Sequence, residues 1–413
     1  MKKEILLISI GIGVGGLLYF MSSKKTPQLI QSYSPQLIQS YSHLIYTDGS
    51  EIFAQNGKTG KIDYSGVYLN DVLNLIPDHS TIEIVPSYYE MNGGVTLNDT
   101  EIYSRHYNTQ HYIKVVGGYK GYLFTFNYGR NRIEGLRIET EGANGIYLTD
   151  RSADNKIYDM WFNSNAGGTA IFATNTDFKI SKVHIFGFNY GIYCVTCADC
   201  FVSETKVGGT KEYTGSQTGI FIATSANMNF DQVNVHSNDI GYQIQGSNRI
   251  NISDGLIELN GHHGIRLSAG SLPNKIITIT GNRILENGQG LLLNSSGIFL
   301  SSLYNTTGMI IANNIIGNYS NVPPGYTNFS QKYGIFEDNS NIVNSIYTGN
   351  IFEDIAIKPI IKTSEFSTAI QNFGSSPFNH GNHNTEPTAF GAGDKYFNTN
   401  ENKQYYYNGT TWN

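Results

Sequence analysis

The sequence is poor in charge, in cysteine and in tryptophan. Only 15% of its 413 residues are Asp, Glu, Lys or Arg, and the net charge of −6 provides no basic footprint. We therefore expect no nucleic-acid partner. Three cysteines cannot supply the four ligands of a structural zinc by themselves. The chain also has no His-Glu-x-x-His motif and no glycine-rich phosphate loop after a strand, so we expect no cofactor and no resident metal.

The three cysteines lie close together as Cys194, Cys197 and Cys200. They fall across an expected strand–turn–strand junction, so we expect their side chains to point in different directions, as free residues of the core or the turn. A disulfide between two of them is one alternative. The other is a metal site completed by His184.

What the chain does have is a repeat of about 22–28 residues between Asn131 and Ile361. Each copy has two apolar residues five positions apart, then Asn three residues later, then Gly followed by an apolar residue. The apolar pairs begin at Ile157, Phe230, Ile252, Ile279 and Ile310, and the glycines are Gly145, Gly191, Gly219, Gly264, Gly290 and Gly334. A fixed period of short β-rich segments predicts a solenoid of stacked coils.

Stacking would align the apolar residues of each coil inside the solenoid, about 4.8 Å from their neighbours. The repeated asparagines could then hydrogen-bond to one another as a buried ladder; they are Asn165, Asn238, Asn260, Asn287 and Asn318. The alternative is that they are ordinary turn residues, because asparagine readily adopts turn conformations.

This pattern resembles the pectin-lyase-like superfamily over residues 45–370. A short helix expected near residues 65–76, a turn at 77–80, a strand at 81–86 and then Tyr89-Glu90 are similar to the usual start of that fold. The resemblance implies an all-β protein, a right-handed single-stranded parallel β-helix of nine to ten coils whose first end is plugged by the helix. It implies no single function, since the fold carries lyases, hydrolases, tailspikes and adhesins.

The N-terminal end contains a second signal. Residues 5–21 are continuously apolar or small and are flanked by lysines, which predicts a single-pass transmembrane helix in an anchor over residues 1–25. A cleaved secretory signal is the alternative. Residues 26–44 contain a direct duplication and are predicted to form a stalk.

The C-terminal end departs from the repeat. Residues 371–390 are predicted to be a linker, and residues 391–413 to form a β-hairpin module with two aromatic strands. This tail is similar to modules near the ends of phage-type tail fibres. The similarity implies a viral or cell-surface attachment protein.

Two columns of outward-facing residues could contain catalytic side chains. The first contains Asp159, Lys182, Glu204, Gln232 and Asp254, and the second contains Arg137, Trp161, His184, Lys206 and Asn234. Asp159 and Glu204 would lie about 10 Å apart, near the separation used by inverting glycosidases. Lys182 between them would favour two ionised carboxylates, whereas a general acid must be protonated.

A second group combines acidic, basic and histidine side chains of two successive coils: Asp254, Glu258, His262, His263 and Arg266, with Arg283 and Glu286 on the following coil. In a polysaccharide lyase of this fold, carboxylates of this kind would hold Ca²⁺ and the basic residue would abstract a proton. The alternative is a solvated turn, because charged side chains usually lie at the surface.

The most regular outward feature is aromatic: Tyr147, Phe172, Tyr193 and Phe221 are expected to stack in one stripe. Such a stripe could bind a glycan, form a subunit contact in a homotrimer, or be covered by the chain's own loops. The sequence favours a membrane-anchored, surface-exposed β-helix that binds glycans or a host surface. The alternative is a polysaccharide lyase or glycoside hydrolase of the same fold.

Overall fold

The structure is a computed structural model that places most of the expected solenoid and parts of both ends. It describes residues 18–20, 28–30, 41–104, 112–209, 217–268, 270, 272–290, 294–301, 306–318, 330–339, 341–355, 357–363, 367–370, 372, 379–383, 395–398, 401, 403–406 and 411.

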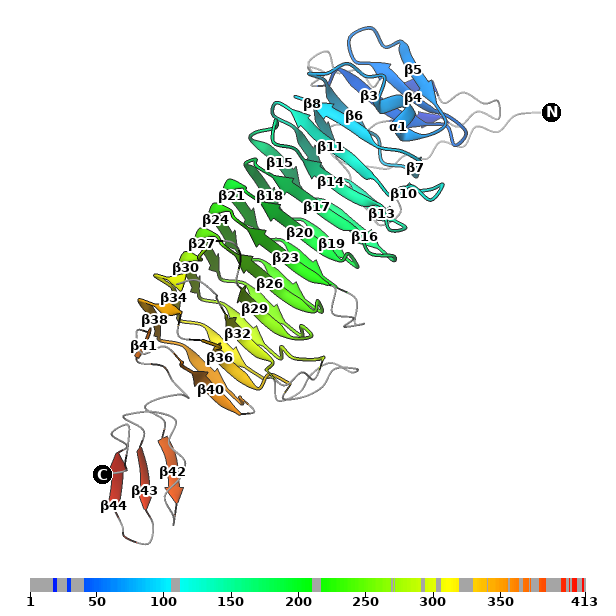
Figure 1. Ribbon diagram of the computed structural model, residues 1–413. Helices are drawn as coiled ribbons and strands as arrows, with labels where there is room; N and C mark the ends of the chain where they lie inside the picture. The colour runs from blue at the N-terminus through cyan, green and yellow to red at the C-terminus, as the bar shows by residue number, and fades with distance from the viewer. Residues whose placement is uncertain are drawn as a thin grey trace, which may run out of the picture.

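The central part of the chain is a parallel β-solenoid in which each coil adds one strand to each of three sheets (Figure 1). Sheet 1 contains β7 (Tyr89–Met91), β10 (Ile113–Val115), β13 (Arg137–Thr140), β16 (Trp161–Ser164), β19 (His184–Phe186), β22 (Lys206–Gly208), β25 (Asn234–His236), β28 (Leu256–Glu258), β31 (Arg283–Leu285), β35 (Ile315–Gly317) and β39 (Ile351–Glu353). Sheet 2 contains β8 (Val95–Asn98), β11 (Tyr122–Tyr128), β14 (Asn144–Leu148), β17 (Thr169–Thr174), β20 (Tyr190–Val195), β23 (Thr218–Ala223), β26 (Ile240–Gln245), β29 (His263–Ser268), β32 (Ser296–Leu300), β36 (Tyr333–Glu337) and β40 (Lys358–Ile361).

Sheet 3 closes the solenoid. It contains β6 (Thr81–Ile84), β9 (Glu101–Tyr103), β12 (Arg132–Glu134), β15 (Asn155–Tyr158), β18 (Phe178–Ser181), β21 (Ala198–Ser203), β24 (Ala226–Asp231), β27 (Asn248–Ser253), β30 (Lys275–Thr280), β34 (Ile310–Ala312), β38 (Ser345–Thr348) and β41 (Ser367–Ile370), with the short β33 (Thr306–Thr307) and β37 (Ile342–Val343) beside them. The two sheets have 11 strands each, close to the predicted nine to ten coils.

The register explains the core. Ile146, Ile171, Ile192 and Ile220 pair in succession along sheet 2, and all four are fully buried. Parallel pairing in register places the same face of every coil inside, so one apolar position per repeat becomes a continuous column.

The predicted asparagine ladder is confirmed in its middle part. Asn238, Asn260 and Asn287 are buried and bonded in succession, and the next rung is Gln331 rather than Asn318. Asn318 is buried beside Gln331 and bonds its backbone. Asn165 is exposed, so its assignment to the ladder was wrong.

A second ladder of the same kind was not predicted. Asn282, Asn314, Asn350 and Asn372 are buried, and each of the first three donates its side-chain amide to the next. The ladder lies at the corner between sheets 3 and 1, where it satisfies buried backbone groups that would otherwise lack partners.

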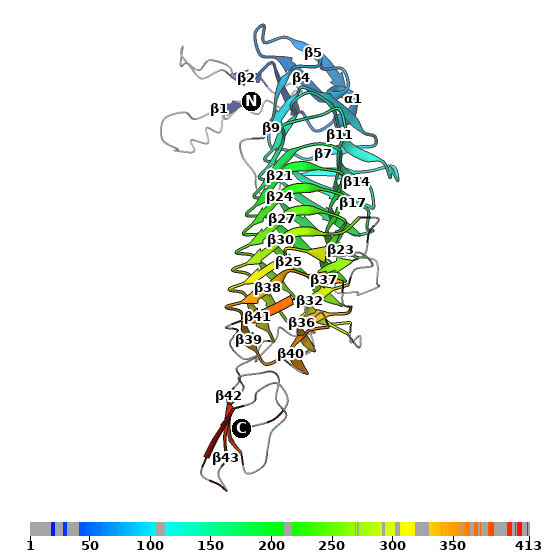
Figure 2. The same ribbon diagram turned by 60° about the vertical axis from the view of Figure 1, so that its left-hand side comes forward.

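The first end of the solenoid is covered by a cap (Figure 2). It consists of the antiparallel strands β3 (His43–Thr47), β4 (Ile52–Asn56) and β5 (Ile62–Gly66), followed by helix α1 (Leu69–Leu73), which is shorter than expected. Leu69, Val72 and Leu73 of the helix are buried in the core, so the predicted plug is present. The cap hides the outer edge of β6, because β3 pairs with it.

Both ends differ in part from expectation. Leu18–Phe20 of the predicted transmembrane helix forms strand β1, because its backbone pairs antiparallel with β2 (Gln28–Ile30). No helix in the described part of the chain is long and apolar enough to span a membrane; residues 5–17 and Met21 of the predicted span lie outside that part. At the C-terminus β43 (Lys395–Asn398) and β44 (Lys403–Tyr406) pair as an antiparallel hairpin, and β42 (Asn379–His383), inside the predicted linker, adds a third strand.

Candidate functional site

The described surface contains an open groove at the corner between sheets 3 and 1. Its cavity volume is about 670 Å³, and it is lined by His184, Glu204, Thr205, Lys206, Gln232, Asn234 and Asp254. Six of these side chains belong to the two outward columns expected from the sequence, and Thr205 lies between the columns. The groove therefore spans neighbouring coils and runs along the solenoid.

The first of these columns does not lie on a strand. Asp159, Lys182, Glu204, Gln232 and Asp254 all have positive φ values, between 46° and 57°. They form the turn that joins sheet 3 to sheet 1, so the expectation that they face outward from a sheet was wrong. The left-handed conformation turns the chain within one residue, and it presents these side chains at the rim of the groove.

An aromatic wall continues the groove toward the N-terminus. The ring centroid of Trp161 lies 5.0 Å from that of His184 and 5.6 Å from that of Phe186. The Lys206 ammonium lies 5.8 Å from the centroid of Phe186. Gly208 occupies the coil between Phe186 and His236, and a Cβ atom there would approach both rings to less than 3 Å. Only glycine at this position leaves room for the Phe186 and His236 rings to lie over the strand.

The histidines around the groove are held neutral. Burial, and then the charge of Lys206, lower the pKa of His184. The same two causes lower the pKa of His236 to about 4. At neutral pH each ring offers one hydrogen-bond donor and one acceptor. The groove therefore carries two carboxylates against a single ammonium.

The predicted aromatic stripe exists as a stacked ladder on sheet 2. Centroid distances are 5.2 Å between Tyr147 and Phe172, 5.2 Å between Phe172 and Tyr193, and 4.6 Å between Tyr193 and Phe221. Two of these pairs are close to parallel, at 13° and 21°. The ring faces therefore lie mainly against each other, and the ladder presents mostly ring edges to solvent.

The structure does not bring the second acidic group together. Asp254 lies at the groove corner, Glu258 lies on β28 of sheet 1, and Arg266 lies on β29 of sheet 2, between Gln243 and Phe299. Each belongs to a different face of the solenoid. Within the described region, no group of three His, Cys, Asp or Glu side chains is placed to hold a metal ion.

The three cysteines were expected to diverge, but all of them point inward. Cys194, Cys197 and Cys200 are buried, and within the described structure they are free thiols. Cys197 stands where the following coils have Ser225 and Ser247, and its backbone N–H donates to the Ser225 hydroxyl. They are therefore small core residues, which was the expected role.

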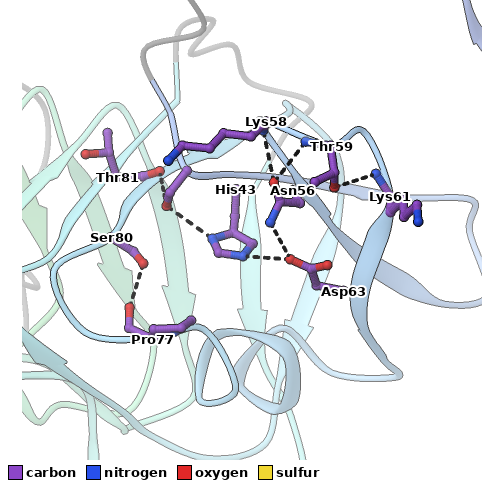
Figure 3. Close-up of polar contacts among 10 residues, drawn as sticks. His43, Asn56, Lys58, Thr59, Lys61, Asp63, Pro77, Ser80 and Thr81 are labelled. Atoms are coloured by element: carbon purple, nitrogen blue, oxygen red, sulfur yellow. Dashed lines mark hydrogen bonds and ion pairs between the residues drawn. The ribbon is translucent and has the colours of Figure 1, made fainter.

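One further polar group was not anticipated from the sequence. In the N-terminal cap, Ser42 Oγ lies 3.1 Å from His43 Nδ1, and His43 Nε2 lies 3.4 Å from Asp63 (Figure 3). These are the residue types of a hydrolytic triad. However, the Ser42 hydroxyl donates to the carbonyl of Thr81 at 2.9 Å and the His43 ring is buried. The group holds β3 against β5 and β6.

Comparisons with known proteins agree on the fold. The family described as right-handed beta helix region matches residues 169–385, just over half of the chain. No curated protein matches the sequence. The structure is similar to the A-module of Azotobacter vinelandii mannuronan C-5 epimerase AlgE4, with a TM-score of 0.51 and 14% identity over 70% of this chain and 90% of that one.

Two further solved structures are similar at comparable levels. DFA-IIIase from Arthrobacter chlorophenolicus A6 has a TM-score of 0.52 and 11% identity over 72% of this chain and 84% of that one. Tailspike protein 2 of an Escherichia coli O157:H7 bacteriophage has a TM-score of 0.56 and 12% identity over 70% of this chain, but the match covers only 42% of the tailspike. At these identities the likeness concerns the fold.

Proposed function

The chain belongs to the right-handed β-helix family, and from that premise we propose that it is a surface-exposed glycan-binding protein whose ligand lies in the groove between sheets 3 and 1. The observation that carries the proposal is the lining of this groove. Its carboxylates accept hydrogen bonds, its ammonium donates them, and the amides of Gln232 and Asn234 do both.

This mixture matches a ligand whose groups are hydroxyls, each of which donates and accepts. The aromatic wall at Trp161 and Phe186 adds apolar ring surface beside the polar lining, as ligand sites commonly do. An apolar ligand would leave the polar groups unpaired, and an anionic polymer would meet two carboxylates. A neutral or weakly charged oligosaccharide fits best.

The similar structures support a carbohydrate ligand. One is a mannuronan epimerase by its title, and another is a tailspike. We further propose that the protein is displayed at a cell or virion surface, supported by its low charge and its tail-fibre-like tail. Anchoring through residues 5–21 is a separate proposal, which co-flotation of the full chain with lipid vesicles would test.

A glycan array with the full-length protein tests binding. We expect retention of a defined set of glycans by the wild type, and at least about tenfold weaker binding by the double variant Lys206→Ala/Asn234→Ala, a loss of about 1.4 kcal/mol. Lys179→Ala is the matched control, because Lys179 is exposed on sheet 3 outside the groove. Unchanged binding by a folded double variant would refute the groove as the site.

Hydrolysis of the bound glycan is a second candidate function, favoured by one observation. Glu204 and Asp254 lie two coils apart on the same corner, about 10 Å by the spacing of stacked strands, and the residue between them is the uncharged Gln232. That separation is close to the range of inverting glycosidases. Asp159 and Glu204, by contrast, have Lys182 between them, and the dispersed acidic group argues against a lyase.

An assay for new reducing ends on the glycans identified by the array separates the two functions. Release that disappears in both Glu204→Gln and Asp254→Asn, but persists in Asp159→Asn, would establish hydrolysis. Binding without any release would leave the protein a lectin-like binder.

A further inference from the structure

The last coils of the solenoid expose an aliphatic face that neither the core nor the groove uses. Ile310 on β34 pairs in register with Ile346 on β38, and around the corner Ile315 on β35 pairs with Ile351 on β39. Ile310, Ile346 and Ile351 are 43%, 44% and 40% exposed. We call these four residues the isoleucine face; Figure 2 labels two of its strands, β38 and β39, at the C-terminal end of the stack.

The fold does not require isoleucine at these positions. The register places Asn229, Asn251 and Thr278 before Ile310 in the same outward column, and Thr368 follows Ile346. On sheet 1, Arg283 precedes Ile315. Polar side chains therefore occupy the same outward position in neighbouring coils. Isoleucine at this position exposes apolar surface to solvent and adds nothing to the core.

On sheet 1 the charges beside the face change sign along the solenoid axis. Arg283 is exposed one coil before Ile315, and Glu353 and Asp354 are exposed on the last coil, which also holds Ile351. On sheet 3 both neighbouring charges are basic: Lys275 is exposed one coil before the face, and Lys362 bonds the Ser367 carbonyl one coil after it. Asn313 is exposed at the corner between Ile310 and Ile315, and the rest of the face is aliphatic, so the face offers a glycan few hydrogen-bonding groups. If a second copy packs on the face with its axis reversed, Arg283 of each copy lies toward Glu353 and Asp354 of the other, and isoleucine meets isoleucine.

We propose that the isoleucine face binds the same face of a second copy of this chain in an antiparallel, two-fold arrangement. A two-fold contact uses one patch on both subunits and must be self-complementary. The reversal of charge sign beside the face on sheet 1 meets that condition. A parallel arrangement, as in a homotrimer with aligned solenoids, would place like charges at the same height.

Sedimentation or light scattering of the full-length protein tests the proposal. We expect a mass of twice the 45.7 kDa chain and at least about tenfold weaker self-association in Ile310→Thr/Ile346→Thr. Threonine occupies this column in adjacent coils, so these variants should fold. Ile62→Thr, at an exposed residue of the cap, is the matched control.

Reversing the charges beside the face provides a second, independent test of the dimer. Glu353→Lys should weaken the dimer, and adding Arg283→Glu should restore it, because the pair exchanges signs across the interface. A monomeric or trimeric wild type, a dimer unaffected by the isoleucine variants, or a double charge variant no better than Glu353→Lys would each overturn the proposal.

Discussion

The phenol of Tyr347 donates a hydrogen bond of 2.6 Å to Oε1 of Glu337, and both side chains are completely buried. The same carboxylate accepts from the Ser367 hydroxyl at 2.5 Å and from the Thr363 backbone N–H at 2.9 Å. Glu337 belongs to β36, Tyr347 to β38 and Ser367 to β41. One carboxylate thus ties together strands near the C-terminal end of two sheets.

Removing this carboxylate should loosen the C-terminal coils. In Glu337→Gln one acceptor oxygen becomes an amide donor that faces another donor, and hydrogen bonds to charged groups contribute about 1.5–3 kcal/mol each. We expect the midpoint of thermal unfolding to fall by several degrees. Tyr347→Phe should show a smaller loss, because it removes one donor only. Equal stability of Glu337→Gln and the wild type in calorimetry would contradict this.

The asparagine ladders should be among the most sensitive buried positions. Asn314 accepts from the backbone and side chain of Asn282 and donates to Asn350 and to the carbonyl of Ile279. Asn314→Ala leaves these buried groups unpaired, at about 1–3 kcal/mol for each. Chemical denaturation should show a large loss, whereas Asn165→Ala, at an exposed turn, should stay within about 0.5 kcal/mol of the wild type.

Acid should destabilise the protein through its half-buried histidines His236 and His263. Burial lowers the pKa of His263 to about 3, with Arg266 adding to the effect, and that of His236 to about 4. In the unfolded chain both would titrate near about 6.5. Between the folded and unfolded pKa values, the unfolded state binds more protons than the folded state. The stability that depends on neutral histidines is therefore fully present above pH ~6.5 and declines as the pH falls toward ~4. Unfolding midpoints measured from pH 7.5 to 4.5 should decrease, and His236→Gln/His263→Gln should flatten the decrease. A double variant with the full wild-type slope would refute the assignment.

The aromatic ladder should behave as a structural stack. A double-mutant cycle on Tyr193→Ala and Phe221→Ala should give a coupling of about 0.5–1.5 kcal/mol, the range for aromatic pairs. Glycan retention on the array should survive both changes, because the rings lie 4.6 Å apart with their faces together. If folded variants instead lose the glycans while Lys206→Ala/Asn234→Ala retains them, the ligand site is the ladder.

The period of the sequence by itself determined the solenoid of stacked coils, the inward isoleucine columns and the stacking of Tyr147 on Phe172. These features repeat once per coil, and a parallel register copies each position onto the next coil. The plugging helix does not repeat, and it was predicted from the resemblance to the pectin-lyase-like superfamily. The duplicated Thr280-Gly281-Asn282 and Thr348-Gly349-Asn350 could also have revealed the second ladder.

Only the tertiary structure decided where the non-repeating parts lie. The left-handed backbone at Glu204 and Asp254 moves their side chains from a sheet face to a corner, and this creates the groove. Asn165 is not part of the ladder, because its turn differs from the turns of the later coils. Gln331 takes the position after Asn287, although the two are 44 residues apart in the sequence. The cap strands and the buried carboxylate of Glu337 depend on contacts between residues far apart in the chain, which no local pattern specifies.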